Sequence, residues 1–257
     1  MQKIGGRLFA DSKIMFQRCF KISLRNPESL VMATVTPIFL MLLFGAVFGN
    51  IADVGAYSYI DFIVPGIILQ AVAQASQHTA ISVHTDISKG IIDRFRSMPL
   101  ARPAVLVGHA GASILKNSLT TAIIIGTAFI VGFRPQAGFA AWLIIAGILL
   151  LCVAALTWIA ILCGLQSKSA EGTSGLMFPF FILPFLSSGF APTETMHASI
   201  RWFAQYQPMT PIIDALRALM LGMPPGRALP IALAWLIGTI IFTCILSVQV
   251  YQRKLSK

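Results

Sequence analysis

Charged residues are scarce in this sequence. Asp, Glu, Lys and Arg make up 11% of the 257 residues, hydrophobic residues make up 56%, and the mean hydropathy is +0.80. A soluble domain of this length has no need of so much apolar surface. Several apolar runs reach about 18 residues, a length that crosses the hydrocarbon of a bilayer as a helix. The sequence therefore predicts an all-α, polytopic membrane protein with one transmembrane domain over residues 1–257.

The sequence also lacks the motifs of metal sites and of hydrolases. The cysteines are Cys19, Cys152, Cys163 and Cys244, and three of the histidines are His78, His84 and His109. No pair of cysteines has metal-ligand spacing, and no H-E-x-x-H or G-x-S-x-G sequence occurs. We therefore expect no metal site and no disulfide framework, and an intramembrane enzyme is only a minor alternative.

A nucleotide-binding loop of the P-loop type is missing as well. No G-x-x-x-x-G-K-[S/T] sequence occurs, so an ATP-driven function would need an ATPase from another chain, and this polypeptide is not expected to be an enzyme. The net charge of +10 could suggest nucleic-acid binding, but no nucleic-acid-binding module is recognisable. Cytoplasmic loops of membrane proteins collect Lys and Arg, which explains the charge without nucleic acid.

The apolar runs predict six transmembrane helices. They cover about 29–49, 57–84, 104–132, 139–165, 173–188 and 228–250. Pro179 and Pro184 should kink the fifth helix. Residues 1–28 alternate apolar and basic side chains, which is the pattern of an amphipathic helix in the membrane interface; a soluble tail is the alternative.

The segment 189–226 is only partly apolar and is expected to form two short helices on the external side. Thr210 is suited to cap the second helix, and Gly222 follows its end. Asp214 and Arg217 are three residues apart and can pair on the helix surface. An aromatic anchor in the membrane interface is the alternative interpretation of this segment.

The distribution of Lys and Arg predicts the orientation. With six helices, one side of the membrane holds six basic residues near the N-terminus, four in 86–103, one in 166–172 and three in the tail, fourteen in all. The other side holds four, and Lys116 falls within the third helix. The positive-inside rule then places both termini and the segment 86–103 in the cytoplasm.

The charged stretch DISKGIIDRFRSMPLARP at 86–103 separates two apolar runs. Its apolar residues share one helix face, and they are Ile87, Ile91, Phe95 and Met98. Lys89, Asp93 and Arg96 occupy the other side, and Pro99 ends the pattern. An amphipathic helix over 86–98 can rest on lipid or dock into a groove of a cytoplasmic partner, and periodicity does not choose between these.

Polar side chains form stripes on the second and third expected helices. The members of interest are Gln70, Gln74, Gln77, His78, Lys116 and Asn117. Polar groups in hydrocarbon are costly, so these stripes should face protein or water. They can line a translocation path or a dimer interface, or they can hold the bundle together by hydrogen bonds. We expect Lys116 to face an aqueous cavity or the dimer interface, with Gln74 or Gln77 as its partner.

Three stretches in order resemble the permease subunits of type-2 ABC exporters, and among them the daunorubicin-resistance-type permeases. They are YSYIDFIVPGIILQ at 57–70, KGIIDRFRSMPLARPAVLVGH at 89–109, and SGFAPTETMHASIRWFAQYQPMTPIIDALRALMLG at 188–222. The likeness covers essentially the whole chain. His197 stands where the family commonly has Pro, and His109 where it often has Arg, which leaves the subfamily and the substrate open.

The resemblance implies a dimer of this chain, or of this chain and a paralogue, with two ATP-binding cassette subunits that bind ATP and Mg²⁺. Residues 86–98 would be the coupling helix, and the short helices of 189–226 would be re-entrant. Ile91, Phe95 and Met98 would enter the ATPase groove, and Asp93, Arg94 and Arg96 would pair with its rim. The expected location is the cell (inner or plasma) membrane, in contact with membrane lipids.

The expected function is outward transport of an amphipathic drug, a lipid-like molecule or a glycan. A secondary transporter or channel without an ATPase is the alternative. Such proteins use ionisable groups inside the membrane, and here the acids within the spans are limited to Asp61 and Glu171, near the two boundaries. A structural membrane protein without transport is a third possibility.

Overall fold

The fold is a bundle of helices. A computed structural model describes residues 11–21, 27–49, 57–89 and 104–255. These residues lie in helices, turns or loops, and they contain no strand. Five helices are long and apolar enough to cross a membrane: α2 (Pro27–Phe48), α3 (Tyr59–Ser88), α5 (Ala104–Val131), α6 (Phe139–Gln166) and α10 (Ala228–Leu255). Five of the predicted spans are therefore confirmed as helices, to within about four or five residues at each end.

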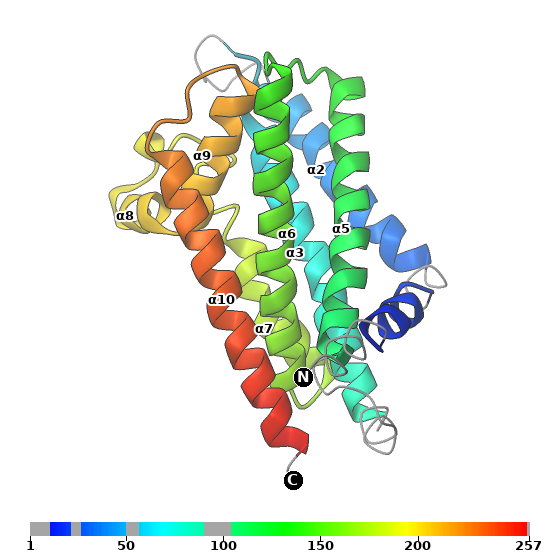
Figure 1. Cartoon of the computed structure of the whole chain (residues 1–257). Coiled ribbons are helices and arrows are strands. Elements are labelled where there is room, and N and C mark those ends of the chain that lie inside the picture. The colour runs from blue at the N-terminus through cyan, green and yellow to red at the C-terminus, as the bar shows by residue number, and fades with distance from the viewer. Residues whose placement is uncertain (1–10, 22–26, 50–56, 90–103, 256–257) are drawn as a thin grey trace.

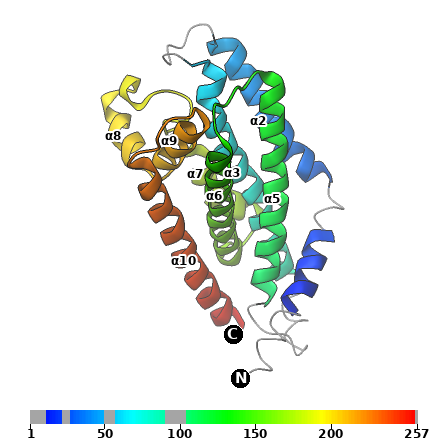
Figure 2. The same cartoon turned by 45° about the horizontal axis from the view of Figure 1, so that its top comes forward.

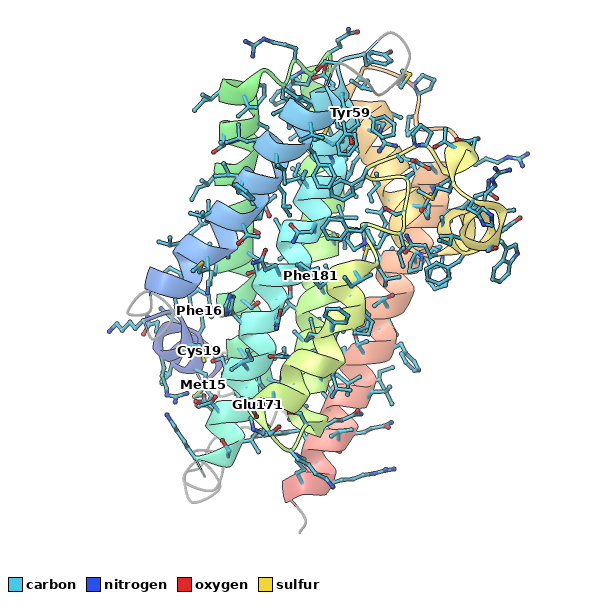
Figure 3. The ribbon with its side chains drawn as sticks, turned by 180° about the vertical axis from the view of Figure 1, so that it is seen from behind. Met15, Phe16, Cys19, Tyr59, Glu171 and Phe181 are labelled. Atoms are coloured by element: carbon cyan, nitrogen blue, oxygen red, sulfur yellow. The ribbon has the colours of Figure 1, made fainter. Side chains whose placement is uncertain are left out.

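The long helices run roughly along one axis (Figure 1). Tyr59 lies at one end of the bundle, and Glu171 lies toward the opposite end, where α3 and α10 finish (Figure 3). We call these the Tyr59 end and the Ser88 end. The helix at 11–21 lies beside the Ser88 half of α5, and the short helices of residues 198–220 lie toward the Tyr59 end (Figures 1 and 2).

The segment expected as a fifth span is shorter than predicted. Helix α7 (Ala170–Ile182) has 13 residues, which is about 20 Å at the rise of an α-helix. Ser169 caps its start, because its hydroxyl accepts a hydrogen bond from the amide of Gly172 at 3.0 Å. Pro179 lies inside α7, whereas Pro184 comes just after its end, in a run of turns that continues to residue 190.

The segment 189–226 forms short helices, as predicted. They are η1 (Thr193–Thr195), α8 (Ala198–Tyr206) and α9 (Met209–Met220). Gly222 follows α9 with a positive φ of 71°, which suits glycine. The prediction that Thr210 caps α9 was wrong, since α9 already begins at Met209 and the Thr210 hydroxyl instead donates to the carbonyl of Ala204.

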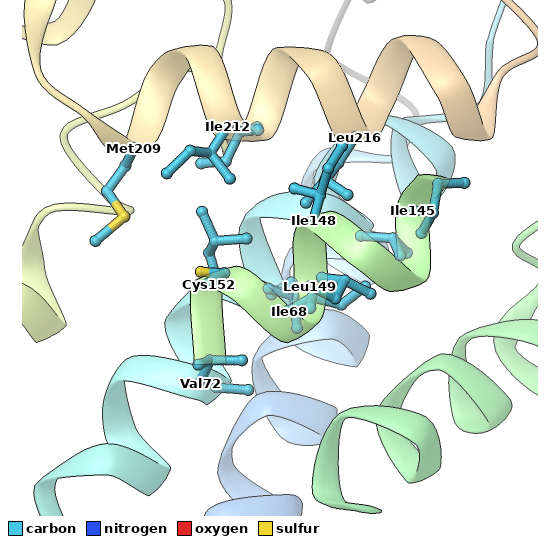
Figure 4. Close-up of a cluster of buried hydrophobic side chains, with 14 of the residues drawn as sticks. Ile68, Val72, Ile145, Ile148, Leu149, Cys152, Met209, Ile212 and Leu216 are labelled. Atoms are coloured by element: carbon cyan, nitrogen blue, oxygen red, sulfur yellow. The ribbon is translucent and has the colours of Figure 1, made fainter. Parts of the chain in front are cut away.

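Helix α3 lies at the centre of the bundle, in contact with α2, α5, α6, α7 and α9. It is the least hydrophobic of the five long helices, and 89% of its most apolar stretch is buried, against 39% or less for the other four. In a bilayer the polar helix gains most from protein neighbours, because lipid offers its side chains no hydrogen bonds. Figure 4 shows part of the apolar core, where Ile68 of α3 lies beside Leu149 of α6, and Ile212 and Leu216 of α9 face Cys152 and Ile148 of α6.

A close backbone contact fixes α3 against the turn after α7. A Cβ atom added to Gly66 would lie 2.7 Å from both the Cα and the carbonyl oxygen of Gly189. No side chain fits between the two backbones at this separation. Glycine at position 66 is therefore required by the packing of α3 and not by its own backbone angles.

We predict that Gly66→Ala destabilises the protein by about 1–3 kcal/mol, because the added methyl group forces the backbones apart. Thermal unfolding in mild detergent is the measurement. Gly126→Ala is the matched control, since a Cβ there meets no atom within 4 Å, and alanine favours a helix over glycine. Equal melting temperatures for Gly66→Ala and the wild type would contradict the contact.

Candidate functional site

The six residues predicted to couple to an ATPase lie outside the described residues. They are Ile91, Asp93, Arg94, Phe95, Arg96 and Met98. The description resumes on both sides of them, at Lys89 and at Ala104. Asp86, Ile87 and Ser88, which we expected to begin the coupling helix, form the last turn of α3. The segment is thus joined directly to the ends of two long helices.

A charged cluster stands beside this segment at the Ser88 end. The two oxygens of Asp86 accept hydrogen bonds from the two terminal nitrogens of Arg18, at 2.8 and 3.3 Å. The Nε2 atom of His109 lies 3.1 Å from Oδ2 of the same carboxylate. The hydrogen bonds that Arg18 donates to Asp86 raise the pKa of Arg18 above its ordinary value. One carboxylate therefore joins the helix at 11–21, α3 and α5.

The helix at 11–21 is packed on the bundle as well as paired with it. Met15 is buried and belongs to the same apolar cluster as Val105 and Leu106 of α5. A Cβ on Gly108 would lie 2.5 Å from the Cβ of Met15, so the two helices nearly touch there. Figure 3 shows Met15, Phe16 and Cys19 beside the lower part of the bundle. This helix thus has a protein-facing side, besides any side that it offers to lipid.

Four of the polar residues predicted on the second helix lie on α3. Gln70 is fully buried, whereas Gln74, Gln77 and His78 are partly exposed. From Gln74 to Val83, the residues of α3 that are not buried recur every three or four positions, namely Gln74, Gln77, His78, Ile81 and Ser82. Thr85 continues this spacing into the last turn of α3, where every residue is at least partly exposed. This spacing defines one uncovered face of the Ser88 half of α3, which we call the open polar face.

A second group of polar side chains is closed inside the bundle. The hydroxyls of Thr79 and Ser113 are 2.7 Å apart, and those of Ser113 and Thr157 are 3.1 Å apart. Asn117 donates a hydrogen bond to Ser76 at 3.2 Å. These bonds link α3, α5 and α6 within one chain. Asn117 is 1% exposed and so lies inside the bundle, where its bond to Ser76 fits the bundle-holding alternative, and its role stays a prediction.

Lys116 is partly buried on α5, one residue before Asn117. Its charge interacts with His78 of the open polar face. Our expectation that Gln74 or Gln77 is its partner stays a prediction. Lys116 and His78 therefore bring ionisable groups of two helices close together within the apolar bundle.

Arg217 joins three elements at the Tyr59 end. Its side chain donates to the carbonyl of Phe62 at 3.1 Å, to that of Ser188, and to Oδ1 of Asp214 at 3.0 Å. The guanidinium also lies 3.8 Å from the centre of the Phe62 ring. The predicted pair of Asp214 and Arg217 is confirmed, but Arg217 is 11% exposed and reaches into the structure. Burial lowers the pKa of Arg217 to about 10, which leaves it charged at neutral pH.

Further bonds close the same end. Asp61 accepts a hydrogen bond from the backbone amide of Arg134 at 2.8 Å. The amide of Gln136 donates to the carbonyl of Met220 at 2.8 Å, and the hydroxyl of Tyr59 donates to the carbonyl of Phe190 at 3.0 Å. The start of α3, the loop between α5 and α6, and the segment around α9 are therefore fastened together.

The sequence did not reveal the contacts of Arg18, Asp86 and His109. Each residue stood in a recognisable place, namely the basic N-terminal stretch, the charged segment and the polar stripe of the third helix. The pairing joins residues 68 and 23 positions apart, which is beyond the reach of periodicity. In the described residues, no group of three His, Cys, Asp or Glu side chains is placed to hold a metal ion.

Comparison with known proteins identifies the class. The family model for the ABC-2 type transporter matches residues 11–221, so the chain belongs to this family. With its five candidate spans, it is the membrane subunit of an ABC transporter. Family permeases are not themselves the ATPases of these transporters, and an ATP-binding subunit is the partner that the family implies.

Three relatives illustrate the match. The daunorubicin resistance ABC transporter permease DrrB1 of Streptomyces coeruleorubidus is 29% identical over 231 residues, 89% of this chain and 81% of the relative. The probable doxorubicin resistance permease DrrC of Mycobacterium tuberculosis is 28% identical over 261 residues, 98% of this chain and 92% of the relative. The inner membrane transport permease YadH of Escherichia coli K12 is 27% identical over 60% of each chain.

We predict that Arg217→Gln lowers the free energy of unfolding by about 3 kcal/mol, because it leaves Asp214 and two carbonyl groups without their buried partner. Thermal unfolding in mild detergent measures the loss. Arg227→Gln is the control, since Arg227 is exposed and a surface change should stay within about 0.5 kcal/mol. Similar losses for the two variants would show that Arg217 does not fasten this end.

Proposed function

We propose that this chain is the permease subunit of an ATP-driven exporter that moves an amphipathic drug, a lipid-like molecule or a glycan outward. The observation that carries the proposal is the likeness along nearly the whole chain to permeases named for daunorubicin and doxorubicin resistance. The three stretches that suggested the family lie within the matched length, apart from the final Gly222.

The proposed topology has six crossings, with α7 and the turns to residue 190 as the fifth. In support, α6 finishes and α7 begins toward the Ser88 end, whereas α10 begins toward the Tyr59 end and finishes at the Ser88 end (Figures 1 and 2). The chain must return between α6 and α10, and α7 is the helix that starts this return. The basic residues of 11–21, Lys89 and the tail favour a cytoplasmic Ser88 end. The membrane is the inner or plasma membrane, as in the name of YadH.

The open polar face of α3 supports a dimer with a second copy or a paralogue. Gln74, Gln77 and His78 would be costly against lipid tails, so a partner permease or a water-filled path should cover them. Lys116 is close enough to His78 for their charges to interact, and it would lie beside the same path. Gln70 and Asn117 are buried within the chain and would pack behind the residues that line this path.

Energy would enter through the segment between α3 and α5. A separate ATPase subunit binds ATP and Mg²⁺, and Ile91, Phe95 and Met98 dock into its groove while Asp93, Arg94 and Arg96 pair with the rim. Because the segment connects the ends of α3 and α5, its displacement would act on the helices that carry His78 and Lys116. Membrane lipids surround the assembly.

The secondary transporter or channel without an ATPase is the second candidate. A coupling group inside the membrane would favour it, and Asp61 is the acid within the described long helices closest to that role. However, Asp61 accepts a hydrogen bond from the backbone amide of Arg134, in the loop at the Tyr59 end. This position suits a carboxylate that caps a loop better than one that transfers ions across the membrane.

We predict that Phe95→Asp abolishes binding of the ATPase subunit, because a carboxylate cannot replace an aromatic anchor in an apolar groove. The tagged chain is purified in mild detergent, and the proteins that accompany it are identified by mass. Phe139→Asp is the matched control, because Phe139 is 82% exposed at the other end of the bundle, where α6 begins.

An ATPase that accompanies the wild type and Phe139→Asp, but not a folded Phe95→Asp, supports both the exporter and the coupling segment. If a well-folded wild type carries no ATPase, the second candidate gains. An ATPase bound equally to all three proteins would place the contact outside Phe95.

We predict that Lys116→Leu lowers transport at least ten-fold, because it removes the cation beside the open polar face. ATP-dependent uptake of daunorubicin into inside-out vesicles is the measurement. The size of the purified protein in detergent reports whether the dimer still assembles. Leu119→Ala is the control, since Leu119 is 51% exposed on the same helix. Unchanged transport together with unchanged assembly would remove Lys116 from the path and from the interface.

A further inference from the structure

The cluster of Arg18, Asp86 and His109 has a use beyond fastening a terminal helix. Asp86 stands three residues before Lys89, where the described part of α3 ends, and His109 stands in the second turn of α5. The two residues therefore flank the segment 90–103 on its two sides. Arg18 comes from a helix that is not part of this connection.

The geometry makes Asp86 the shared partner. Both of its oxygens bind Arg18, and one of them also meets His109. The carboxylate side chain is 14% exposed, and the His109 side chain is 5% exposed. A carboxylate held by two donors in so little solvent fixes the relative positions of the three elements, because movement of any one breaks a charged hydrogen bond.

The packing beneath the cluster makes the same connection. A Cβ atom added to Gly108 would lie 2.5 Å from the Cβ of Met15. One added to Gly111, one turn further along α5, would lie 3.0 Å from a ring carbon of Phe16. Val83 of α3 belongs to the same apolar cluster as Met15. The helix at 11–21 therefore cannot slide along α5 or lift from it without opening apolar contacts as well as the ion pair.

We propose that Asp86 is a positioning residue for energy coupling: through Arg18 and His109 it clamps the helix at 11–21 and the start of α5 to the end of α3, so that all three move together when the segment 90–103 is displaced. This proposal rests on the proposed function of that segment. Without the clamp, displacement would separate the ends of α3 and α5 and would not reach the open polar face.

The clamp predicts a specific defect. In Asp86→Asn and in Arg18→Gln, the amount of bound ATPase and its ATP hydrolysis stay within two-fold of the wild type, whereas transport falls at least five-fold. The number of molecules moved per ATP hydrolysed therefore drops, which a merely structural residue would not cause. The double variant should transport no less than either single variant, because the two residues act through one contact.

The test uses the full chain with its co-purifying ATPase in proteoliposomes, with daunorubicin and a fluorescent phospholipid as probes. Lys21→Gln is the matched control, since it removes one positive charge from the exposed side of the same helix and should leave transport per ATP unchanged. Asp86→Glu keeps the charge and should retain more transport than Asp86→Asn, which guards against a variant that simply misfolds.

A second readout follows the clamp itself. Trypsin should cleave after Lys13 and Lys21 at least five-fold faster in Asp86→Asn than in the wild type, because the helix at 11–21 is released. Wild-type cleavage rates in the variant would overturn the clamp.

Three further results would count against the proposal, each in a distinguishable way. Transport per ATP that stays unchanged in an active Asp86→Asn complex overturns the coupling role alone. Loss of bound ATPase from Asp86→Asn would make Asp86 part of the docking surface and not a positioning residue. A wild type with bound ATPase but no ATP-dependent uptake of either probe would reject the proposed function, and the coupling role with it.

Discussion

The cost of placing polar groups in hydrocarbon governs this structure. The least hydrophobic of the long helices, α3, is the one most enclosed by the others. Its hydroxyl groups find partners on α5, as in the bond between Thr79 and Ser113 and the bond from Asn117 to Ser76. The more apolar helices stand outside, where lipid is an acceptable neighbour. This division leaves the open polar face of α3 uncovered, and this face is therefore the candidate lining of the transport pathway.

The two ends of the bundle are built differently. At the Tyr59 end, Arg217, Asp61 and Tyr59 bind backbone groups of distant segments, so the region around α9 is fixed to the start of α3. At the Ser88 end, a side-chain cluster around Asp86 holds the helix at 11–21, and α3 lies between this helix and α7 (Figure 3). Bonds to backbone groups hold the Tyr59 end in a fixed arrangement, whereas the shared carboxylate of Asp86 would make three helices at the Ser88 end move as one unit.

Much of the fold could be predicted from local pattern, and the site only in part. Apolar length located five long helices, because the bilayer fixes that length. The fifth expected span ended early at Ile182, since the turns around Pro184 take up what the apolar composition assigned to a helix. Thr210 looked like a cap but bonds to Ala204, and a local motif cannot show which acceptor a hydroxyl will meet. Arg18 and Asp86 were both visible in the sequence, but their pairing depends on how the helix at 11–21 packs against α5 and α3.

The hydrogen bonds of α3 also constrain the order in which the protein can fold during its synthesis. Its polar groups are matched by Asn117, 41 residues after Ser76, and by Arg217, 155 residues after Phe62. When α3 itself is synthesised, neither partner exists yet. The central helix therefore cannot complete these bonds until the last third of the chain, which carries Arg217, has been made. Truncated chains that end before Arg217 would thus expose α3 to quality control, even though each of their apolar helices is long enough to insert.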